Sequence, residues 1–131
     1  MFIFNNFGER MKKYLGFIAA TFLLVEGFGV GAAMAGNKYG AIATGANGAY
    51  GYSYNYDSQT DAEYAALYEC GSTCSIQVWF ANACGAVAKG GGATGWAWNV
   101  NKDEAQDNAL SSCRDYGGSN CQIVAWACTD R

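Results

Sequence analysis

Six cysteines, two groups of carboxylates and two rows of aromatic rings are the side chains with the clearest potential for chemistry. The 131-residue chain contains no histidine. It therefore has no histidine general base, no catalytic triad built on histidine and no histidine metal ligand. Its serines do not form a Gly-x-Ser-x-Gly or a Ser-x-x-Lys pattern. Any catalysis would have to depend on thiols or carboxylates.

The cysteines favour disulfides over a thiol or a metal site. An even number of cysteines in an exported chain is typical of a disulfide framework, which compensates for the limited core of a small domain. A zinc site is disfavoured because no Cys-x-x-Cys pair and no histidine are present. We expect three disulfides, no bound metal and no thiol nucleophile.

The carboxylates gather at the predicted starts of two helices. Paired carboxylates are the machinery of glycoside hydrolysis, but acidic side chains at helix starts also cap the helix and interact with its dipole. The second explanation is favoured. The two groups are Asp57, Asp61 and Glu63, and Asp103, Glu104 and Asp107. Glycines 90–92 lack the Gly-Lys-Ser/Thr of a phosphate loop. We therefore expect no catalytic residue and no cofactor.

The aromatic rows are the candidate binding surface. In the run from Tyr50 to Tyr56, tyrosines alternate with Gly, Ser and Asn, and Gly95 to Val100 repeats the pattern with tryptophans. Alternate side chains of a strand share one face. The expected role of these rings is core packing around the helices, because large aromatic side chains are mostly buried. The alternative is an exposed stacking platform for a glycan or an aromatic partner. The rings in question are Tyr52, Tyr54, Trp96 and Trp98.

Residues 39–83 and 84–128 read as two tandem repeats that would position these side chains. Tyr-Gly-Ala-Ile-Ala matches Cys-Gly-Ala-Val-Ala, and Gly-Tyr-Ser-Tyr-Asn matches Gly-Trp-Ala-Trp-Asn. The pattern of each repeat predicts a strand, a strand, a helix and a strand. We expect an α+β domain of two ββαβ repeats with pseudo-twofold symmetry, a mainly antiparallel sheet and two helices.

Turn and cap residues define the predicted elements. Ala46-Asn47-Gly48 favours a type I′ hairpin turn, and the glycines at 90–92 favour a second one. Ser58 and Asn101 are predicted N-caps, and Gly71 and Gly117 are predicted helix ends. The predicted buried helix faces consist of small residues: Ala62, Ala65, Ala66 and Cys70, and Ala105, Ala109 and Cys113. Asn82-Ala83 must form either a tight hairpin or a bend in one long strand, and the strand order stays open.

Repeat equivalence suggests a disulfide pairing. Cys70 and Cys74 occupy the same repeat positions as Cys113 and Cys121, so each pair would tie a helix end to the next strand. Cys84 and Cys128 have no counterparts and are left to pair with each other. The predicted bridges are Cys70–Cys74, Cys113–Cys121 and Cys84–Cys128.

Residues 1–35 read as an N-terminal extension followed by a signal peptide. Met11-Lys12-Lys13, an apolar run and Ala33-Met34-Ala35 predict cleavage after Ala35, with either Met1 or Met11 as the true start. Residues 36–131 would then form one disulfide-bonded domain. With five basic and nine acidic side chains its net charge is −4, which argues against nucleic acid and anionic membranes as partners. We expect a secreted or periplasmic protein without stable membrane insertion.

The repeat motifs resemble a known family. Gly-Tyr-Ser-Tyr-Asn, Ala-x-x-Ala-Ala-Leu-x-x-Cys, Trp79-Phe80-x-Asn82-x-Cys84-Gly85 and Gly95-Trp96 together resemble the secreted bacterial family catalogued as domain of unknown function 4189. The resemblance covers Tyr39 to Cys128. It implies a small exported bacterial protein and supplies no catalytic residues.

The expected function is binding without catalysis. A rigid, cross-linked, acidic and aromatic-rich scaffold favours an inhibitor, immunity or host-interaction factor whose partner is another protein. One alternative is a module that binds a cell-wall glycan or peptidoglycan through the aromatic rows. A second alternative is an enzyme with an unrecognised carboxylate site.

Overall fold

The computed structural model describes residues 36–130 and contains two similar ββαβ units. The predicted signal peptide and its cleavage after Ala35 lie outside the described residues. The first unit consists of β1 (Tyr39–Thr44), the 3₁₀ turn η1 (Ala46–Gly48), β2 (Tyr50–Tyr56), α2 (Gln59–Cys70) and β3 (Ser75–Ala81). The second consists of β4 (Cys84–Gly90), β5 (Ala93–Asn99), α3 (Lys102–Asp115) and β6 (Gln122–Cys128). The predicted α+β fold is confirmed.

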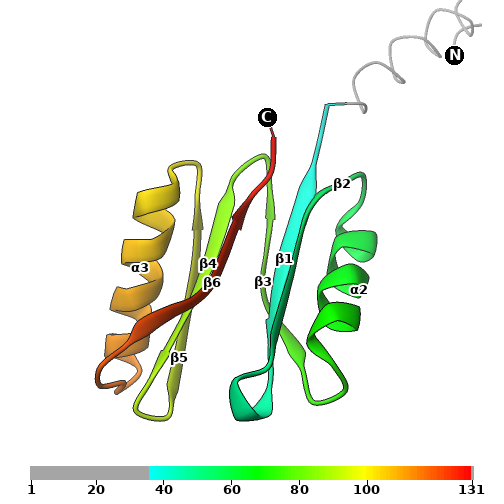
Figure 1. The fold of residues 1–131 in the computed structure, drawn as a ribbon. Helices are drawn as coiled ribbons and strands as arrows, with labels where there is room; N and C mark the ends of the chain where they lie inside the picture. Colours follow the sequence, from blue (N-terminus) through cyan, green and yellow to red (C-terminus); the bar gives the residue numbers. More distant parts are fainter. Residues whose placement is uncertain (1–35, 131) are drawn as a thin grey trace, which may run out of the picture. The chain divides into compact units, whose positions relative to one another are not determined.

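The elements form four layers, with two sheets face to face and one helix on the outside of each (Figure 1). The strand orders are β2-β1-β3 and β5-β4-β6, and all neighbouring strands are antiparallel. The core between the sheets includes Ile42, Val78, Phe80, Val87 and Ala125. Each unit thus contributes one sheet and one helix to a shared interior.

The chain passes from one sheet to the other at Asn82-Ala83. β3 pairs with β1, whereas β4 pairs with β5 and β6. The Asn82 N–H donates to the Lys38 carbonyl at 2.9 Å, and the Thr129 N–H donates to the Ala83 carbonyl at 2.9 Å. Of the two possibilities left by the sequence, the connection is therefore a bend between sheets and not a hairpin.

The predicted turn and capping residues adopt the required conformations. Asn47 and Gly48 have φ of 58° and 79°, and the Ala49 N–H donates to the Ala46 carbonyl, as in a type I′ turn. The Ser58 hydroxyl accepts the Asp61 N–H at 3.1 Å, and the Asn101 amide oxygen accepts the Glu104 N–H at 3.0 Å. These local predictions are confirmed.

The helices cover the small-residue face of the strands and not the aromatic rows. A Cβ on Gly51 would lie 2.4 Å from the Ala66 carbonyl oxygen, and a Cβ on Gly95 would lie 2.1 Å from the Cys113 nitrogen. The Ser53 hydroxyl donates to the Ala62 carbonyl at 2.7 Å. The expectation that the aromatic rows pack around the helices is wrong, because an alanine-faced helix approaches a sheet most closely where the strand also has small residues.

The three disulfides join the same pairs as the predicted scheme: Cys70–Cys74, Cys113–Cys121 and Cys84–Cys128. Cys84 and Cys128 are direct register partners on β4 and β6, with a Cα–Cα distance of 3.9 Å. The equivalent register pair in the first unit is Tyr39 and Ala81. In the first unit, the centroids of the Tyr39 and Trp79 rings are 6.4 Å apart. The first unit thus has an aromatic contact at the end of the sheet where the second unit has a disulfide.

One aromatic ring joins the two sheets at the centre of the core. A Cβ on Gly40 would lie 2.5 Å from the Phe80 ring, and a Cβ on Gly85 would lie 2.4 Å from the same ring. Gly40 and Gly85 are repeat-equivalent and belong to opposite sheets. The repeat equivalent of Phe80 is Ala127. Near a pseudo-twofold axis two equivalent side chains compete for one space, so a large residue in one repeat requires a small one in the other.

Candidate functional site: two aromatic grooves

Two grooves lie on opposite edges of the sandwich and are built from equivalent parts of the two units. We call the first the tyrosine groove; it is lined by Tyr50, Tyr52 and Tyr54 of β2 and by residues 124–128 of β6. The tryptophan groove is lined by Trp96 and Trp98 of β5 and by residues 76–81 of β3. Their volumes of about 490 Å³ and 580 Å³ fall within the usual range of ligand sites.

The predicted binding residues are all exposed, and the structure divides them between the two grooves. Relative exposure is 40% for Tyr52, 53% for Tyr54, 45% for Trp96 and 57% for Trp98. β2 and β5 are edge strands. Their rings, which point away from the helices, are therefore only partly covered by the opposite sheet. The rings are accessible to a ligand, as the alternative interpretation of the rows requires.

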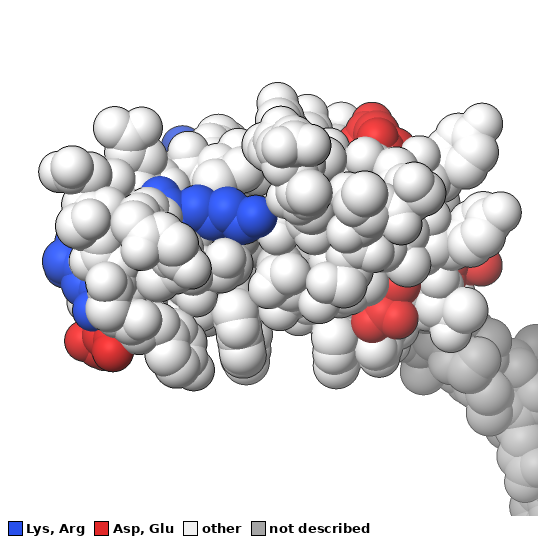
Figure 2. All heavy atoms as spheres, turned by 90° about the horizontal axis from the view of Figure 1, so that it is seen from below, with Lys and Arg blue, Asp and Glu red and all other residues white. Residues whose placement is uncertain are grey.

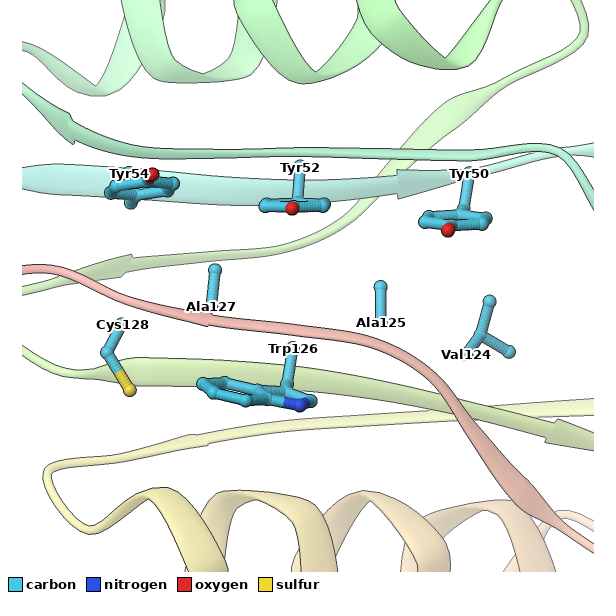
Figure 3. Close-up of a pocket in the computed structure, with 8 residues that line it drawn as sticks. All are labelled: Tyr50, Tyr52, Tyr54, Val124, Ala125, Trp126, Ala127 and Cys128. Carbon is cyan, nitrogen blue, oxygen red and sulfur yellow. The ribbon is translucent and has the colours of Figure 1, made fainter.

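The tyrosine groove has flat aromatic walls on both sides of β6. Figure 3 shows the three tyrosines side by side above β6, with Ala125 and Ala127 pointing toward them and the Trp126 ring on the opposite side of the strand. The Tyr52 and Tyr54 rings are 15° from parallel, with centroids 6.4 Å apart. The Lys102 ammonium lies 5.0 Å from the centroid of the Trp126 ring, within cation–π range. Between these walls β6 presents its open edge.

Backbone pairing shows which groups face that open edge. In an antiparallel ladder, hydrogen-bonded pairs alternate with non-hydrogen-bonded pairs, whose Cα atoms lie closer together. The Thr129 N–H bonds to the Ala83 carbonyl, so Cys128 opposite Cys84 is a non-hydrogen-bonded pair, in agreement with their Cα separation of 3.9 Å. The same alternation makes Trp126 a non-hydrogen-bonded residue. The N–H and C=O groups of Trp126 and Cys128 therefore point away from β4, into the groove.

The tryptophan groove repeats this arrangement. The Asn82–Lys38 backbone bond sets the same alternation on β3, so the N–H and C=O groups of Trp79 and Ala81 face the open edge. Its floor differs, because Val78 and Phe80 stand where the tyrosine groove has Ala125 and Ala127. The two grooves have the same arrangement of strands but differ in the size of the side chains on their floors.

Neither groove is lined by a charged side chain. Viewed from below, most of the visible surface of the molecule is neither acidic nor basic (Figure 2). None of the carboxylates singled out from the sequence lines either groove. Two of them have partners elsewhere: Asp57 accepts from the Lys38 ammonium at 2.7 Å, and Glu63 accepts from the Gln59 amide. Within residues 36–130 no group of three or more potential metal ligands is present.

The sequence interpretation missed Trp79 and Trp126 as site residues, together with the strand edges they belong to. Both tryptophans are more than 40% exposed. Their signal was available, because the two tryptophans occupy equivalent positions of the two repeats. Without the strand order, however, nothing in the pattern showed that these strands lie at the edges of their sheets.

The chain belongs to the family described as domain of unknown function (DUF4189), whose model matches residues 39–128. The resemblance inferred from the repeat motifs is confirmed. Protein Rv1269c of Mycobacterium tuberculosis and Protein Mb1300c of Mycobacterium bovis are each 37% identical to this chain over 97 residues, which is 73% of this chain and 73% of each relative. The NMR structure of Rv1813c from Mycobacterium tuberculosis is similar, with 35% identity and a TM-score of 0.52 over 70% of this chain and 74% of that one.

Proposed function

We propose that this protein is a non-enzymatic binding protein that holds its ligand in the aromatic grooves. One observation carries the proposal: the aromatic rings of β2 and β5 lie exposed in grooves and are not buried in the core. Contiguous exposed apolar surface on a small domain marks a site of interaction, and tyrosine and tryptophan are enriched where partners bind.

The proposal of a non-catalytic role rests on the lining of the grooves. Tyrosine, tryptophan, alanine and valine side chains bind a ligand by contact, stacking and, for the tyrosine hydroxyl and the indole N–H, hydrogen bonding. The carboxylates at the helix starts lie outside both grooves, and Asp57 is paired with the Lys38 ammonium. This chemistry supports an inhibitor, immunity or host-interaction factor whose partner is another protein.

We place the site of action outside the cytoplasm, in the periplasm or the medium. Three disulfides are typical of proteins that mature in an oxidising compartment. No helix within residues 36–130 is long and apolar enough to cross a membrane.

A glycan is a second candidate ligand, supported by the tryptophan groove. The indole rings of Trp96 and Trp98 are about half exposed, and Gln77 supplies an amide in the same groove. An aromatic face with an adjacent amide suits a sugar ring, which needs both stacking and hydrogen bonds. The tyrosine groove has no side-chain amide or charge among its lining residues.

Tryptophan fluorescence tests the proposal directly. The chain has four tryptophans, Trp79, Trp96, Trp98 and Trp126, and each of them lines one of the grooves. Wild-type protein would be titrated with a displayed peptide library, with muropeptides and with chitin oligosaccharides. We expect at least one class to shift the emission.

Groove variants identify where such a ligand binds. Binding should weaken at least tenfold in Tyr52→Ser/Tyr54→Ser or in Trp96→Ser/Trp98→Ser, and it should persist in Tyr116→Ser, whose exposed ring lies beyond α3. Binding that is insensitive to both double variants, or no emission change with any class, would contradict the proposal.

A further inference from the structure

We infer that β6 in the tyrosine groove accepts an uncharged, extended peptide segment as an added strand. The inference rests on the proposed binding function and names the ligand of one groove. Within residues 36–130 the only strand beside β6 is β4. The opposite edge of β6 has the hydrogen-bonding groups of a sheet but no neighbour to use them.

Main-chain hydrogen bonds would provide the attraction. The N–H and C=O groups of Trp126 and Cys128 face the groove, as the register with β4 requires. A peptide residue opposite Trp126 would exchange two N–H···O=C bonds with it, as in any hydrogen-bonded antiparallel pair. Strand addition of this kind derives affinity from the main chain and specificity from pockets for alternate side chains.

The walls of the groove fit the two faces of such a strand. An added strand would lie about 4.8 Å from β6 in the plane of its sheet. Alternate side chains would then point up toward the tyrosine row and down beside Trp126 (Figure 3). Beneath the tyrosines the floor consists of the small side chains Ala125 and Ala127, where the tryptophan groove has the larger Val78 and Phe80.

The absence of charged residues in the lining of the tyrosine groove favours a peptide segment with uncharged side chains. The tyrosine groove has no charged lining residue, and a charge brought beneath the rings would lose its hydration without gaining a partner. A segment of uncharged β-branched and small polar residues avoids this cost and favours the extended conformation.

The neighbouring edge strand β2 favours a single added strand over a second copy of the sandwich. Because β2 and β6 both line this groove, two copies that met here edge to edge would bring their β2 edges together as well. The Tyr52 N–H on β2 already donates to the Glu69 carboxylate at 3.0 Å. At the end of β2, the Asn55 amide donates to the Asp130 carboxylate at 3.1 Å, and the Asp130 N–H donates to the Asn55 amide oxygen at 2.8 Å. A single strand beside β6 needs none of these groups.

A capped seven-residue peptide of alternating threonine and valine is the probe, matched to the seven residues of β6. The full chain would have Trp79, Trp96 and Trp98 replaced by phenylalanine, so that only Trp126 reports. We expect a saturable emission change. Two N-methylated versions of the peptide carry the methyl groups on alternate residues, odd in one and even in the other.

The two methylated peptides distinguish strand addition from side-chain contact. Methyl groups that face β6 remove donors and should lower affinity about tenfold or more, since each donor contributes a main-chain bond. Methyl groups that face away should change affinity less than twofold. Equal loss with both versions, or no loss with either, would overturn the inference.

Further outcomes separate this inference from the proposed function. Binding that Tyr52→Ser/Tyr54→Ser weakens and Tyr116→Ser leaves intact supports the groove as its location. No emission change with the peptide, in a protein whose grooves still bind a glycan or a folded partner, would remove the inference and leave the proposed function standing. A concentration-dependent dimer in sedimentation, competing with the peptide, would assign the edge to a second copy and contradict the inference.

Discussion

Two glycines set the distance between each helix and its sheet. Gly51 and Gly95 occupy equivalent positions on β2 and β5, and a Cβ at either would meet helix backbone at 2.4 Å or less. Backbone atoms cannot move aside as the end of a flexible side chain can. The small-residue face of each strand is therefore a steric requirement of helix packing.

Replacing Gly95 with alanine should destabilise the domain. The added methyl group would collide with the Cys113 nitrogen and the Ala109 carbonyl oxygen, and overpacking of this kind costs about 3 kcal/mol when the backbone must shift. Urea unfolding of Gly95→Ala measures the loss. Gly36→Ala is the control, because nothing lies within 4 Å of its Cβ position; similar midpoints for the two variants would contradict the prediction.

Ser53 provides a second test at the residue scale. Its buried hydroxyl donates to the Ala62 carbonyl and accepts the Ala41 N–H, whereas the equivalent residue of the second unit is Ala97. Ser53→Ala leaves two buried groups without this partner and should cost about 2 kcal/mol. The midpoint of thermal unfolding of Ser53→Ala measures this loss, and Ser72→Ala, on the exposed turn after α2, is the neutral control. A loss below half a degree in the Ser53 variant would show that the bridge contributes nothing.

At the scale of elements, the sequence predicted each strand, helix, turn and cap, but not which strand face the helix covers. Periodicity identifies two faces of a strand without saying what lies against them. Aromatic content pointed to the tyrosine side as the buried one. The better guide is complementarity: a helix face of Ala62 and Ala66 matches Gly51 and Ser53 because all four are small. Matching side-chain volume across the two elements would have placed the rows outside.

The three disulfides should contribute differently to the free energy of unfolding, because the loops that they close differ in length. The chain-entropy relation gives about 4 kcal/mol for Cys84–Cys128, about 2.5 for Cys113–Cys121 and about 2 for Cys70–Cys74, from sequence separations of 44, 8 and 4. Paired Cys→Ala variants, compared by urea unfolding, should follow that order. A larger loss for the Cys70–Cys74 variant than for the Cys84–Cys128 variant would show that loop entropy does not govern these bridges.

At the scale of the whole molecule, the two units meet around a single phenylalanine. Phe80 lies against Gly40 of its own sheet and Gly85 of the other. The repeats predicted equivalence of the two halves, yet the number of sheets and their face-to-face packing did not follow from the pattern. Those features depend on the bend at Asn82-Ala83 and on contacts between residues that are distant in sequence.

Moving the phenylalanine to the other repeat tests the shared centre. Phe80→Ala should cost about 4 kcal/mol because it leaves a cavity between the sheets. In that background Ala127→Phe should recover at least half of the loss, since its ring would enter the same space from the opposite strand. Ala127→Phe alone should destabilise, because two rings would then compete. A double variant no more stable than Phe80→Ala would refute a shared space.

β6 and β3 have open edges on opposite sides of the sandwich. If both edges take up extended segments, the molecule would have a valency of two, and one copy would link two chains or two stretches of one repetitive chain. The second contact would then form at the high effective concentration set by the first, so that modest individual affinities would combine into durable attachment. Because the floors of the grooves differ in volume, the two ends of such a cross-link need not be the same.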